Sequence, residues 1–214
     1  MEKDLQDYRK SYEKFELSDT VIPVSPILLF EEWFVEAEKD DRVDEANAMN
    51  LSTIGKDGFP KNRIVLLKKY NENGFTFYTN YKSEKGIAIQ ENPNVCLSFF
   101  WPNLERQVII KGVATKTTEE DSSKYFYSRP RGSQLGALAS NQSEQISSRE
   151  ELEEKIENLT RQFEGQTIPK PEEWGGYNVS PESYEFWQGR KNRLHDRILF
   201  SKIEEKWKVE RLAP

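Results

Sequence analysis

Short apolar segments separated by turn residues, over residues 48–117, constrain the fold of this chain more than any other feature. Segments 94–101 (NVCLSFFW) and 106–117 (RQVIIKGVATKT) are rich in branched and aromatic residues, and Pro102-Asn103 between them favours a turn. We expect these two segments to pair as a β-hairpin. Strands joined by short turns predict an antiparallel barrel or sandwich.

A second predicted hairpin carries cations and leads into a helix. Segment 63–68 is apolar and branched, segment 75–79 alternates aromatic and hydroxyl side chains, and residues 71–74 (NENG) accept the positive φ of a tight turn. Ser83 can cap a helix, which brings free backbone N–H groups beside Lys85. Cations at strand ends together with a helix N-terminus favour phosphate binding. The alternative is a surface hairpin with solvated lysines.

Several helices are expected around these strands. Ser25-Pro26 can open a helix whose apolar face would cover a sheet, and that face comprises Leu29, Phe30, Trp33, Phe34 and Ala37. Further helices are expected over residues 83–91, after Thr118 and after Ser148. Residues 128–145 are rich in Ser, Gly, Gln and Arg, which predicts a mobile linker or a ligand-binding loop.

The C-terminal part returns to strands, at about residues 184–187, 197–200 and 207–209. The predicted fold class is therefore mainly β with peripheral helices (α+β). A chain of 214 residues is long enough for one substantial core, so we expect residues 21–214 to form a single domain. Residues 1–20 are polar and mixed in charge, which predicts a flexible N-terminal segment.

Composition excludes several classes of function. A net charge of −6 argues against a general binder of nucleic acid or anionic membranes, so any phosphate must be held by local clusters of cations. The single cysteine, Cys96, excludes an internal disulfide, and with a single histidine the chain cannot build a His/Cys zinc site. The charged N-terminus has no apolar signal segment, and no apolar run nears membrane-spanning length. We expect a cytoplasmic protein.

Four clusters of cations stand out, and they exceed what one phosphate would need. They are Arg63 with Lys68, then Lys85, then Arg129 with Arg131, and finally the cations of residues 190–197. This surplus predicts two phosphorylated ligands. Strand alternation would place Arg63 and Lys68 on opposite faces, so they should serve different ligands or one site from different chains. The alternative is that these cations pair with surface carboxylates, at about 0–1 kcal/mol per pair.

His195 is a candidate for catalysis or for ligand binding. No Gly-x-Ser-x-Gly elbow accompanies it, which argues against a Ser-His-Asp triad. Its flanking arginines should favour the neutral imidazole, which can bind a hydroxyl or a phosphate. The alternative is an ordinary polar loop residue. No Gly-x-Gly-x-x-Gly or Walker loop is present, so a Rossmann or P-loop nucleotide site is not expected.

Six motifs taken together, in order along about residues 9–214, resemble the pyridoxine (pyridoxamine) 5′-phosphate oxidase family: RIVLLK, FYTN, LERQV, KYFYSRPRGSQLGA, EFWQGRKNRLHDR and the terminal RLAP. The resemblance implies a split β-barrel that depends on flavin mononucleotide (FMN), and a homodimer with both active sites at the subunit interface. It implies a vitamin B6 enzyme that oxidises pyridoxine or pyridoxamine 5′-phosphate to pyridoxal 5′-phosphate (PLP). Hydride would pass from C4′ to flavin N5, and O2 would be reduced to H2O2.

The resemblance also implies the site residues, motif by motif. FMN binding is implied for Arg63, Ile64, Val65, Leu66, Leu67, Lys68, Tyr78, Thr79, Lys85, Gln107, Gln142, Ser143, Trp187 and Arg197. Substrate binding is implied for Arg9, Tyr12, Lys68, Tyr125, Arg129, Ser133, Arg193, Leu194 and His195. Arg193 and His195 would be catalytic and hold the pyridine ring against the flavin, with Arg9 and Tyr12 folding over it as a lid.

One departure from the family pattern affects the implied phosphate site. Glu84 stands beside Lys85 where the resemblance leads us to expect arginine, and Lys82 is the nearest cation that could compensate. Two other functions stay open. One is a flavin reductase or nicotinamide-dependent oxidoreductase on the same barrel, and the other is a flavin or PLP carrier without turnover. The Arg-Pro-Arg loop and the C-terminal Arg-Leu-His argue against both, because a bare flavin barrel needs neither.

Overall fold

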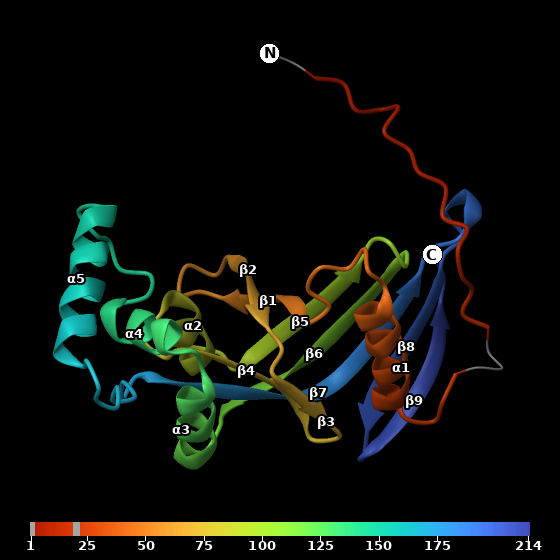
Figure 1. Cartoon of the computed structure of the whole chain (residues 1–214). Coiled ribbons are helices and arrows are strands. Elements are labelled where there is room, and N and C mark those ends of the chain that lie inside the picture. Colours follow the sequence, from red (N-terminus) through yellow and green to blue (C-terminus); the bar gives the residue numbers. More distant parts are fainter. Residues whose placement is uncertain (1–2, 19–21) are drawn as a thin grey trace. The chain divides into compact units, whose positions relative to one another are not determined.

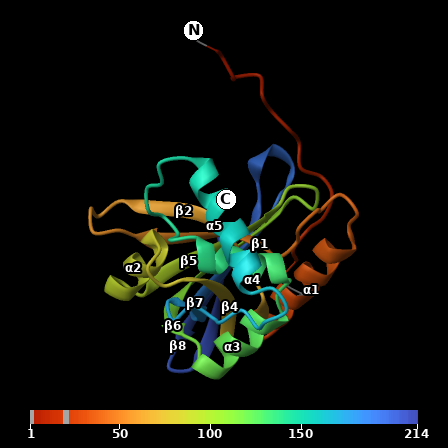
Figure 2. The same cartoon turned by 60° about the vertical axis from the view of Figure 1, so that its left-hand side comes forward.

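The computed structural model of the chain describes residues 3–18 and 22–214 (Figures 1 and 2). The strands are β1 (Ala48–Ile54), β2 (Pro60–Leu66), β3 (Lys69–Asn71), β4 (Gly74–Asn80), β5 (Asn94–Trp101), β6 (Arg106–Lys116), β7 (Trp174–Gln188), β8 (Asp196–Ile203) and β9 (Lys206–Leu212). The α-helices are α1 (Pro26–Lys39), α2 (Glu84–Glu91), α3 (Glu119–Ser128), α4 (Arg131–Ala139) and α5 (Arg149–Gln162), with a short 3₁₀ helix, η2 (Lys191–Arg193). Positions 1, 2, 19 and 20 of the predicted N-terminal segment lie outside the described residues.

The strands of the described residues form one sheet. Its order is β2-β1-β5-β6-β7-β4-β3, and β8 pairs with β7 and with β9. The pairs β3–β4, β4–β7, β7–β8 and β8–β9 are antiparallel. The predicted fold class, mainly β with peripheral helices, is confirmed, and so is the predicted pairing of β5 with β6.

The chain divides into two compact units. The terminal unit comprises the described part of Met1–Met49 together with Leu97–Lys111 and Pro181–Pro214, and the central unit comprises Asn50–Cys96 and Gly112–Ser180. β1, β5, β6 and β7 each contribute residues to both units. The single domain expected for residues 21–214 stays a prediction.

One of the predicted hairpins has a different partner. Most of segment 63–68 forms β2, which pairs with β1, and the arm that pairs with β4 is the short β3. The turn itself is as predicted, with Asn71 opposite Gly74 at a φ of 136°. Because β2 ends at Leu66, strand alternation stops before Lys68, whose backbone N–H donates to Thr76 O at 2.8 Å.

The terminal unit is built around the predicted apolar face of α1. The five predicted positions on this face are all buried: Leu29, Phe30, Trp33, Phe34 and Ala37. The Phe30 ring lies 5.1 Å from Phe99 of β5, and the Trp33 ring lies 5.3 Å from Phe186 of β7. The helix therefore covers the sheet as expected, because its apolar side chains recur at helical spacing.

In the central unit, three helices begin at the predicted caps. Ser83 Oγ accepts a hydrogen bond from Gly86 N, Thr118 Oγ1 from Asp121 N, and Ser148 Oγ from Glu151 N. Each cap satisfies a backbone N–H that has no partner within its helix. α2 ends at Glu91, before Asn92-Pro93, as the proline requires.

The expected linker or loop at residues 128–145 is wrong over most of its length. Its central part forms α4, which begins after Pro130 and buries Leu135 and Ala139. These two residues lie four positions apart, on one face of the helix. α4 lies beside α5 in both views (Figures 1 and 2). Leu135 packs into a cluster with Phe126, Ile168 and Trp174, and this packing stabilises a helix that composition alone does not favour.

β7 begins ten residues before the predicted strand at 184–187. Gly175, Gly176 and Pro181 in this segment resemble turn residues, which hid the strand from sequence analysis. The glycines are needed for close approach: a Cβ at Gly175 would lie 2.1 Å from Tyr81 Oη, and one at Gly176 would lie 2.8 Å from Tyr78 Cε1. Two aromatic rings of the central unit therefore pack directly on the β7 backbone.

No helix among the described residues is long and apolar enough to cross a membrane. Within the same part of the chain, no group of three or more His, Cys, Asp or Glu side chains could hold a metal ion.

Candidate active site

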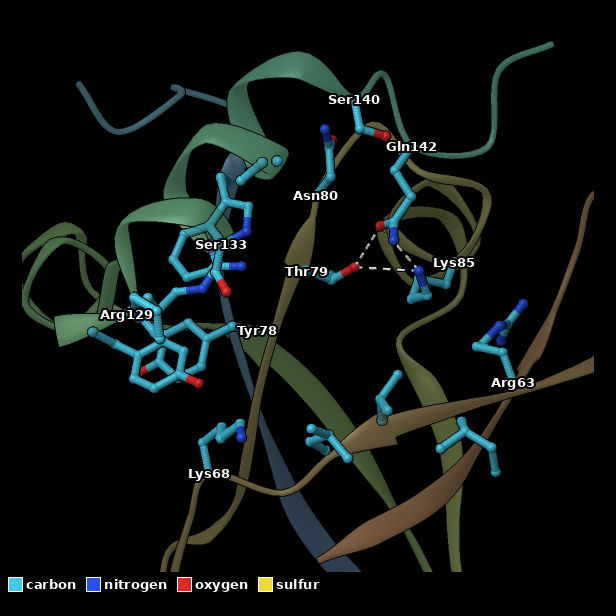
Figure 3. A pocket seen from close by; sticks show the side chains of 18 residues that line it. Arg63, Lys68, Tyr78, Thr79, Asn80, Lys85, Arg129, Ser133, Ser140 and Gln142 are labelled. Carbon is cyan, nitrogen blue, oxygen red and sulfur yellow. Dashed lines mark hydrogen bonds between the residues drawn. The ribbon is translucent and has the colours of Figure 1, made fainter. Parts of the chain in front are cut away.

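The central unit contains a cavity of about 820 Å³ (Figure 3). This volume lies in the usual range for small-molecule sites, about 300–1,000 Å³. Twelve of the residues named from the sequence line it: Arg63, Ile64, Val65, Leu66, Lys68, Tyr78, Thr79, Lys85, Tyr125, Arg129, Ser133 and Gln142. Sequence analysis missed six others: Asn80, Pro130, Gly136, Ala137, Ser140 and Trp174.

A buried lysine lies at one side of the cavity. Lys85 comes from the first turn of α2 and is 9% exposed. Its Nζ donates to Gln142 Oε1 at 3.1 Å and to Thr79 Oγ1 at 3.3 Å, and both partners are neutral. Burial, followed by the nearby charge of Arg63, lowers the pKa of Lys85 to about 8. A buried cation without a carboxylate partner favours the binding of an anion.

Arg63 of β2 lies on the same side of the cavity. Its Nη1 donates to Thr53 Oγ1 at 2.7 Å and to Leu51 O at 3.1 Å. Burial lowers the pKa of Arg63, and the charge of Glu84 opposes this shift. The Glu84 carboxylate itself is exposed and accepts from Lys61 Nζ at 2.6 Å.

Lys82 does not compensate for Glu84. Its ammonium group pairs with Glu173, and its side chain borders a neighbouring groove and not the cavity. Lys85 and Arg63 are therefore the cations on this side of the cavity.

Arg129 and an aromatic wall form the other side of the cavity. The Tyr78 ring stacks on Tyr125 at 4.0 Å and lies 5.5 Å from Trp174. The Arg129 guanidinium lies 4.8 Å above the Trp174 ring, a cation–π contact. Within the described chain, Arg129 Nη1 is a buried nitrogen without a hydrogen-bond partner. Burial lowers the pKa of Arg129, so an anion at Nη1 would satisfy both the charge and the unpaired donor.

The cations fall into two groups across the cavity. In Figure 3, Arg63 and Lys85 lie on one side of Thr79, whereas Arg129 and Lys68 lie on the other. Arg63 and Lys68 thus border one cavity, even though alternation had placed them on opposite faces. Two separated cationic groups in one cavity can bind two phosphates.

Within the central unit, two of the residues assigned to the cofactor do not line this cavity. Leu67 is 4% exposed and belongs to the core, and Ser143 borders the neighbouring groove.

Arg131, the second cation of the Arg-Pro-Arg loop, donates to backbone carbonyls, including Gln166 O at 3.0 Å. Trp174 was missed because no residue pattern predicts that a strand begins there.

Another cluster of the named residues lies in the terminal unit. The rings of Tyr12 and Trp187 lie 5.6 Å apart, those of Tyr12 and His195 5.7 Å apart, and those of Trp187 and His195 4.7 Å apart. Tyr12 and Leu194 also border a groove of about 450 Å³. The structure thus brings together three side chains that are up to 183 positions apart in the sequence (195 − 12).

His195 has a defined tautomer when it is neutral. Its Nδ1 accepts from Arg190 N at 3.1 Å, so the proton of the neutral ring lies on Nε2. Burial lowers the pKa of His195 and Arg193 lowers it further, whereas Asp196 raises it. The lowered pKa agrees with the neutral imidazole expected from the sequence. Its largest cause, however, is burial and not the charge of the arginines.

The other named residues of the terminal unit have varied settings. Arg193 is exposed and, like Asn192, has a positive φ, at 62° and 55°. Arg197 Nε donates to Glu185 Oε1 at 2.8 Å. Gln107 Nε2 donates to Ser98 Oγ at 3.3 Å, and Arg9 is exposed.

Comparison with solved structures identifies the fold class as the split β-barrel. PhzG from Burkholderia lata, solved with tetrahydrophenazine-1-carboxylic acid, is 27% identical, covers 96% of this chain and 100% of its own, and has a TM-score of 0.88. A pyridoxamine 5′-phosphate oxidase-related, FMN-binding protein from Nostoc punctiforme has a TM-score of 0.67 at 17% identity, covering 90% of this chain and 100% of its own.

The family follows from the sequence comparisons. The model of pyridoxamine 5′-phosphate oxidase matches residues 35–163, and that of the pyridoxine 5′-phosphate oxidase C-terminal dimerisation region matches residues 174–214. The pyridoxine/pyridoxamine 5′-phosphate oxidase of Flavobacterium johnsoniae is 62% identical over 98% of this chain and 99% of its own. That of Christiangramia forsetii is 57% identical over the full length of both. The chain belongs to the pyridoxine/pyridoxamine 5′-phosphate oxidase family.

Proposed function

We propose that this protein oxidises pyridoxine 5′-phosphate and pyridoxamine 5′-phosphate to PLP, with reduction of O2 to H2O2. The observation that carries the proposal is full-length similarity, at 57–62% identity, to oxidases that act on these vitamers. The two cationic groups of the cavity support it, because FMN and substrate each carry a phosphate. For the amine, the imine product would hydrolyse and release ammonia. We place this vitamin B6 enzyme in the cytoplasm.

The cavity fits FMN on chemical grounds. Lys85 is buried with only neutral partners, and it has Arg63 beside it, so a phosphate there would be matched by two cations. Thr79 and Gln142 would hold the adjoining polar chain, and residues 64–66 would line the flavin. We assign Gln107, Trp187 and Arg197 to the same cofactor as the resemblance implies. When bound, FMN accepts at N5 the hydride that leaves C4′ of the substrate.

The other cationic group would hold the substrate phosphate. Arg129 offers an unpaired buried N–H, and Lys68, Ser133 and Tyr125 border the same side of the cavity. Arginine matches phosphate oxygens with two parallel hydrogen bonds, which would fix the orientation of the substrate.

The terminal unit would supply the contacts to the pyridine ring. His195 is held by the Arg190 N–H at Nδ1, so its Nε2–H is directed away from that bond and can donate to the ring or its substituents. Arg193 would orient C4′, and Leu194 would contact the ring. Tyr12, with Arg9, would close over the substrate, since its ring already contacts His195.

We infer a homodimer with FMN at the subunit interface. The match of residues 174–214 to the family's C-terminal dimerisation region supports it. Residues proposed for one active site lie in both units, and a second copy offers a way to complete each site.

Absorbance and one turnover assay test the proposed function. The purified protein should be yellow, and it should form PLP and H2O2 from pyridoxine 5′-phosphate under air. Colourless protein that cannot be reconstituted with FMN contradicts the proposal. Dependence on NADPH in place of O2 would identify a reductase, and binding of both ligands without turnover would identify a carrier.

A further inference from the structure

A buried carboxylate in the terminal unit binds the backbone of the N-terminal segment. Glu105, in the turn between β5 and β6, is 2% exposed. Its Oε2 accepts from Glu13 N at 2.8 Å and from Lys14 N at 3.1 Å, and its Oε1 lies 3.8 Å from Lys10 Nζ. Residues 10–17 contain no helix or strand, so these backbone N–H groups have no partner from regular secondary structure.

The next residue holds the same segment through a side chain. The guanidinium of Arg106 makes two cation–π contacts, 4.7 Å from the centroid of the Phe15 ring and 4.5 Å from that of Trp33. Its Nε donates to Gln188 Oε1 at 2.9 Å, and its Nη1 donates to Glu36 Oε2 at 2.6 Å. Four hydrogen-bonded or stacked partners fix this buried cation, and Phe15 of the N-terminal segment is one of them.

The backbone of Glu105 joins this anchor to the end of β7. The residue has a φ of 56°, and its carbonyl oxygen accepts from Gly189 N at 2.7 Å and from Gln188 Nε2 at 3.1 Å. Gly189 also provides the space for Tyr12, because a Cβ at this position would lie 2.8 Å from Tyr12 Cβ and Cγ. The anchored segment and the chain leading to His195 thus meet at Glu105 and Gly189.

Tyr12 lies within this anchored segment and contacts the rings of Trp187 and His195. Beyond it, Leu17 N donates to Asp196 Oδ2 at 3.1 Å, which holds the segment at a second point. We propose that Glu105 and Arg106 are positioning residues that hold residues 10–17 so that Tyr12 closes over the His195 side of the substrate site. The proposal rests on the function proposed above. Neither residue touches the reacting atoms, since each acts through the N-terminal segment.

Three variants of the holoenzyme test this proposal, with Glu31→Ala as control. Glu31 is an exposed carboxylate on α1 of the same unit. Glu105→Ala removes the acceptor, and Glu105→Gln keeps one acceptor oxygen without the charge. Gly189→Ala keeps the carboxylate and crowds Tyr12 most closely, although its Cβ would also lie 3.1 Å from Glu105 Cβ. Two measurements follow each variant: the rate of tryptic cleavage after Lys10 and Lys14, and the KM and kcat for pyridoxine 5′-phosphate.

We expect Glu105→Ala to raise KM about tenfold and to accelerate cleavage to a similar extent, the effect of losing hydrogen bonds to a charged group. kcat and FMN content should change little, because the reacting groups are untouched. Glu105→Gln should lie between Glu105→Ala and the wild type. Gly189→Ala should raise KM in the same way, and Glu31→Ala should match the wild type.

The proposal would be overturned if Glu105→Ala left both the cleavage rate and KM unchanged. It would also be overturned if Glu105→Ala lost kcat and FMN together without faster cleavage, because that result indicates a purely structural role. If Glu105→Ala does not fold, Glu105→Gln and Gly189→Ala decide between the same outcomes. The rate of tryptic cleavage does not depend on turnover. An inactive wild-type protein would therefore refute the proposed function, while the protease assay would still show whether Glu105 holds residues 10–17.

Discussion

Arg129 places its guanidinium above the Trp174 ring and leaves Nη1 buried without a hydrogen-bond partner among the described residues. An unsatisfied buried donor costs free energy, and a substrate phosphate would remove that cost. The neighbouring Arg131 donates to backbone carbonyls away from the cavity. Of two arginines in one short motif, the structure thus leaves one free for an anion.

We predict that Arg129→Ala raises the KM for pyridoxine 5′-phosphate about tenfold or more, because a charge-assisted hydrogen bond to the phosphate is lost. The FMN content, measured by absorbance, should not change. Arg131→Ala is the matched control and should leave KM near the wild-type value. Loss of flavin from Arg129→Ala with an unchanged KM would show that the two phosphate sites are assigned the wrong way round.

Lys85 gives the proposed cofactor site a pH dependence. Its pKa is about 8 in the folded protein without ligand, below the ordinary value of 10.5. The folded protein therefore releases this proton between about pH 8 and pH 10.5, where the unfolded chain still holds it. Stability of the FMN-free protein should thus gain from Lys85 as pH rises through this window, while the charge needed for phosphate is lost.

We predict that the affinity of FMN-free protein for FMN falls about tenfold between pH 7 and pH 9, because the charged fraction of Lys85 falls by that factor around a pKa of about 8. The phosphate of FMN is already largely dianionic over this range. Fluorescence titration measures the affinity. Lys85→Arg keeps its charge and should be insensitive to pH, and an equally flat wild-type profile would contradict the prediction.

Among the elements, α2 connects its helix cap to the proposed cofactor site. Ser83 is fully buried, its Oγ accepts from Gly86 N at 3.3 Å, and its hydroxyl donates to Asn80 O at 2.6 Å. This cap sets the first turn of the helix, where Lys85 is located. A change at the cap should therefore affect both stability and cofactor binding.

We predict that Ser83→Ala lowers the free energy of unfolding by about 1–2 kcal/mol, at the upper part of the range for N-caps because the site is buried. It should also weaken FMN binding severalfold, since Lys85 loses its fixed position. Urea unfolding and FMN titration measure the two effects. Ser148→Ala removes the exposed cap of α5, far along the chain, and should lower stability less without changing FMN affinity. If both variants bind FMN with equal affinity, the cap of α2 does not influence FMN binding.

Some of the helices could be predicted from the sequence and one could not. The caps at Ser83, Thr118 and Ser148 were predicted because an N-cap depends on two or three neighbouring residues. α4 was missed because its stability depends on packing of Leu135 against residues far away in the sequence, including Trp174. Helix caps, which depend on neighbouring residues, were predicted correctly, whereas α4, which depends on tertiary packing, was not.

For the whole molecule, the division of the proposed site residues between two units bears on assembly. Arg63, Lys85 and Arg129 belong to the central unit, and Arg193 and His195 belong to the terminal unit.

We predict that sedimentation equilibrium gives twice the chain mass of 25.1 kDa, because the family's dimerisation region spans residues 174–214. Mixing two inactive variants, Lys85→Met and Arg193→Leu, should restore part of the turnover if a second copy completes each site. A monomer with full activity would contradict this assembly.

The local features of this protein could be predicted from its amino-acid sequence. Most strands, three helix caps, the apolar face of α1 and the cations that line the cavity could be predicted, because each depends on residues close together in the chain. Its motifs were specific enough to indicate the family, and twelve of the named residues line one cavity.

Which of these features come into contact is visible only in the folded structure. It paired β2 with β1 and not with β4, extended β7 through Gly175 and Pro181, and placed Trp174 under Arg129. It also assigned Arg63 and Lys68 to one cavity, because β2 ends before Lys68 and alternation stops there. Strand pairing and burial depend on contacts between distant residues, and their free energy is not encoded in any short stretch of sequence.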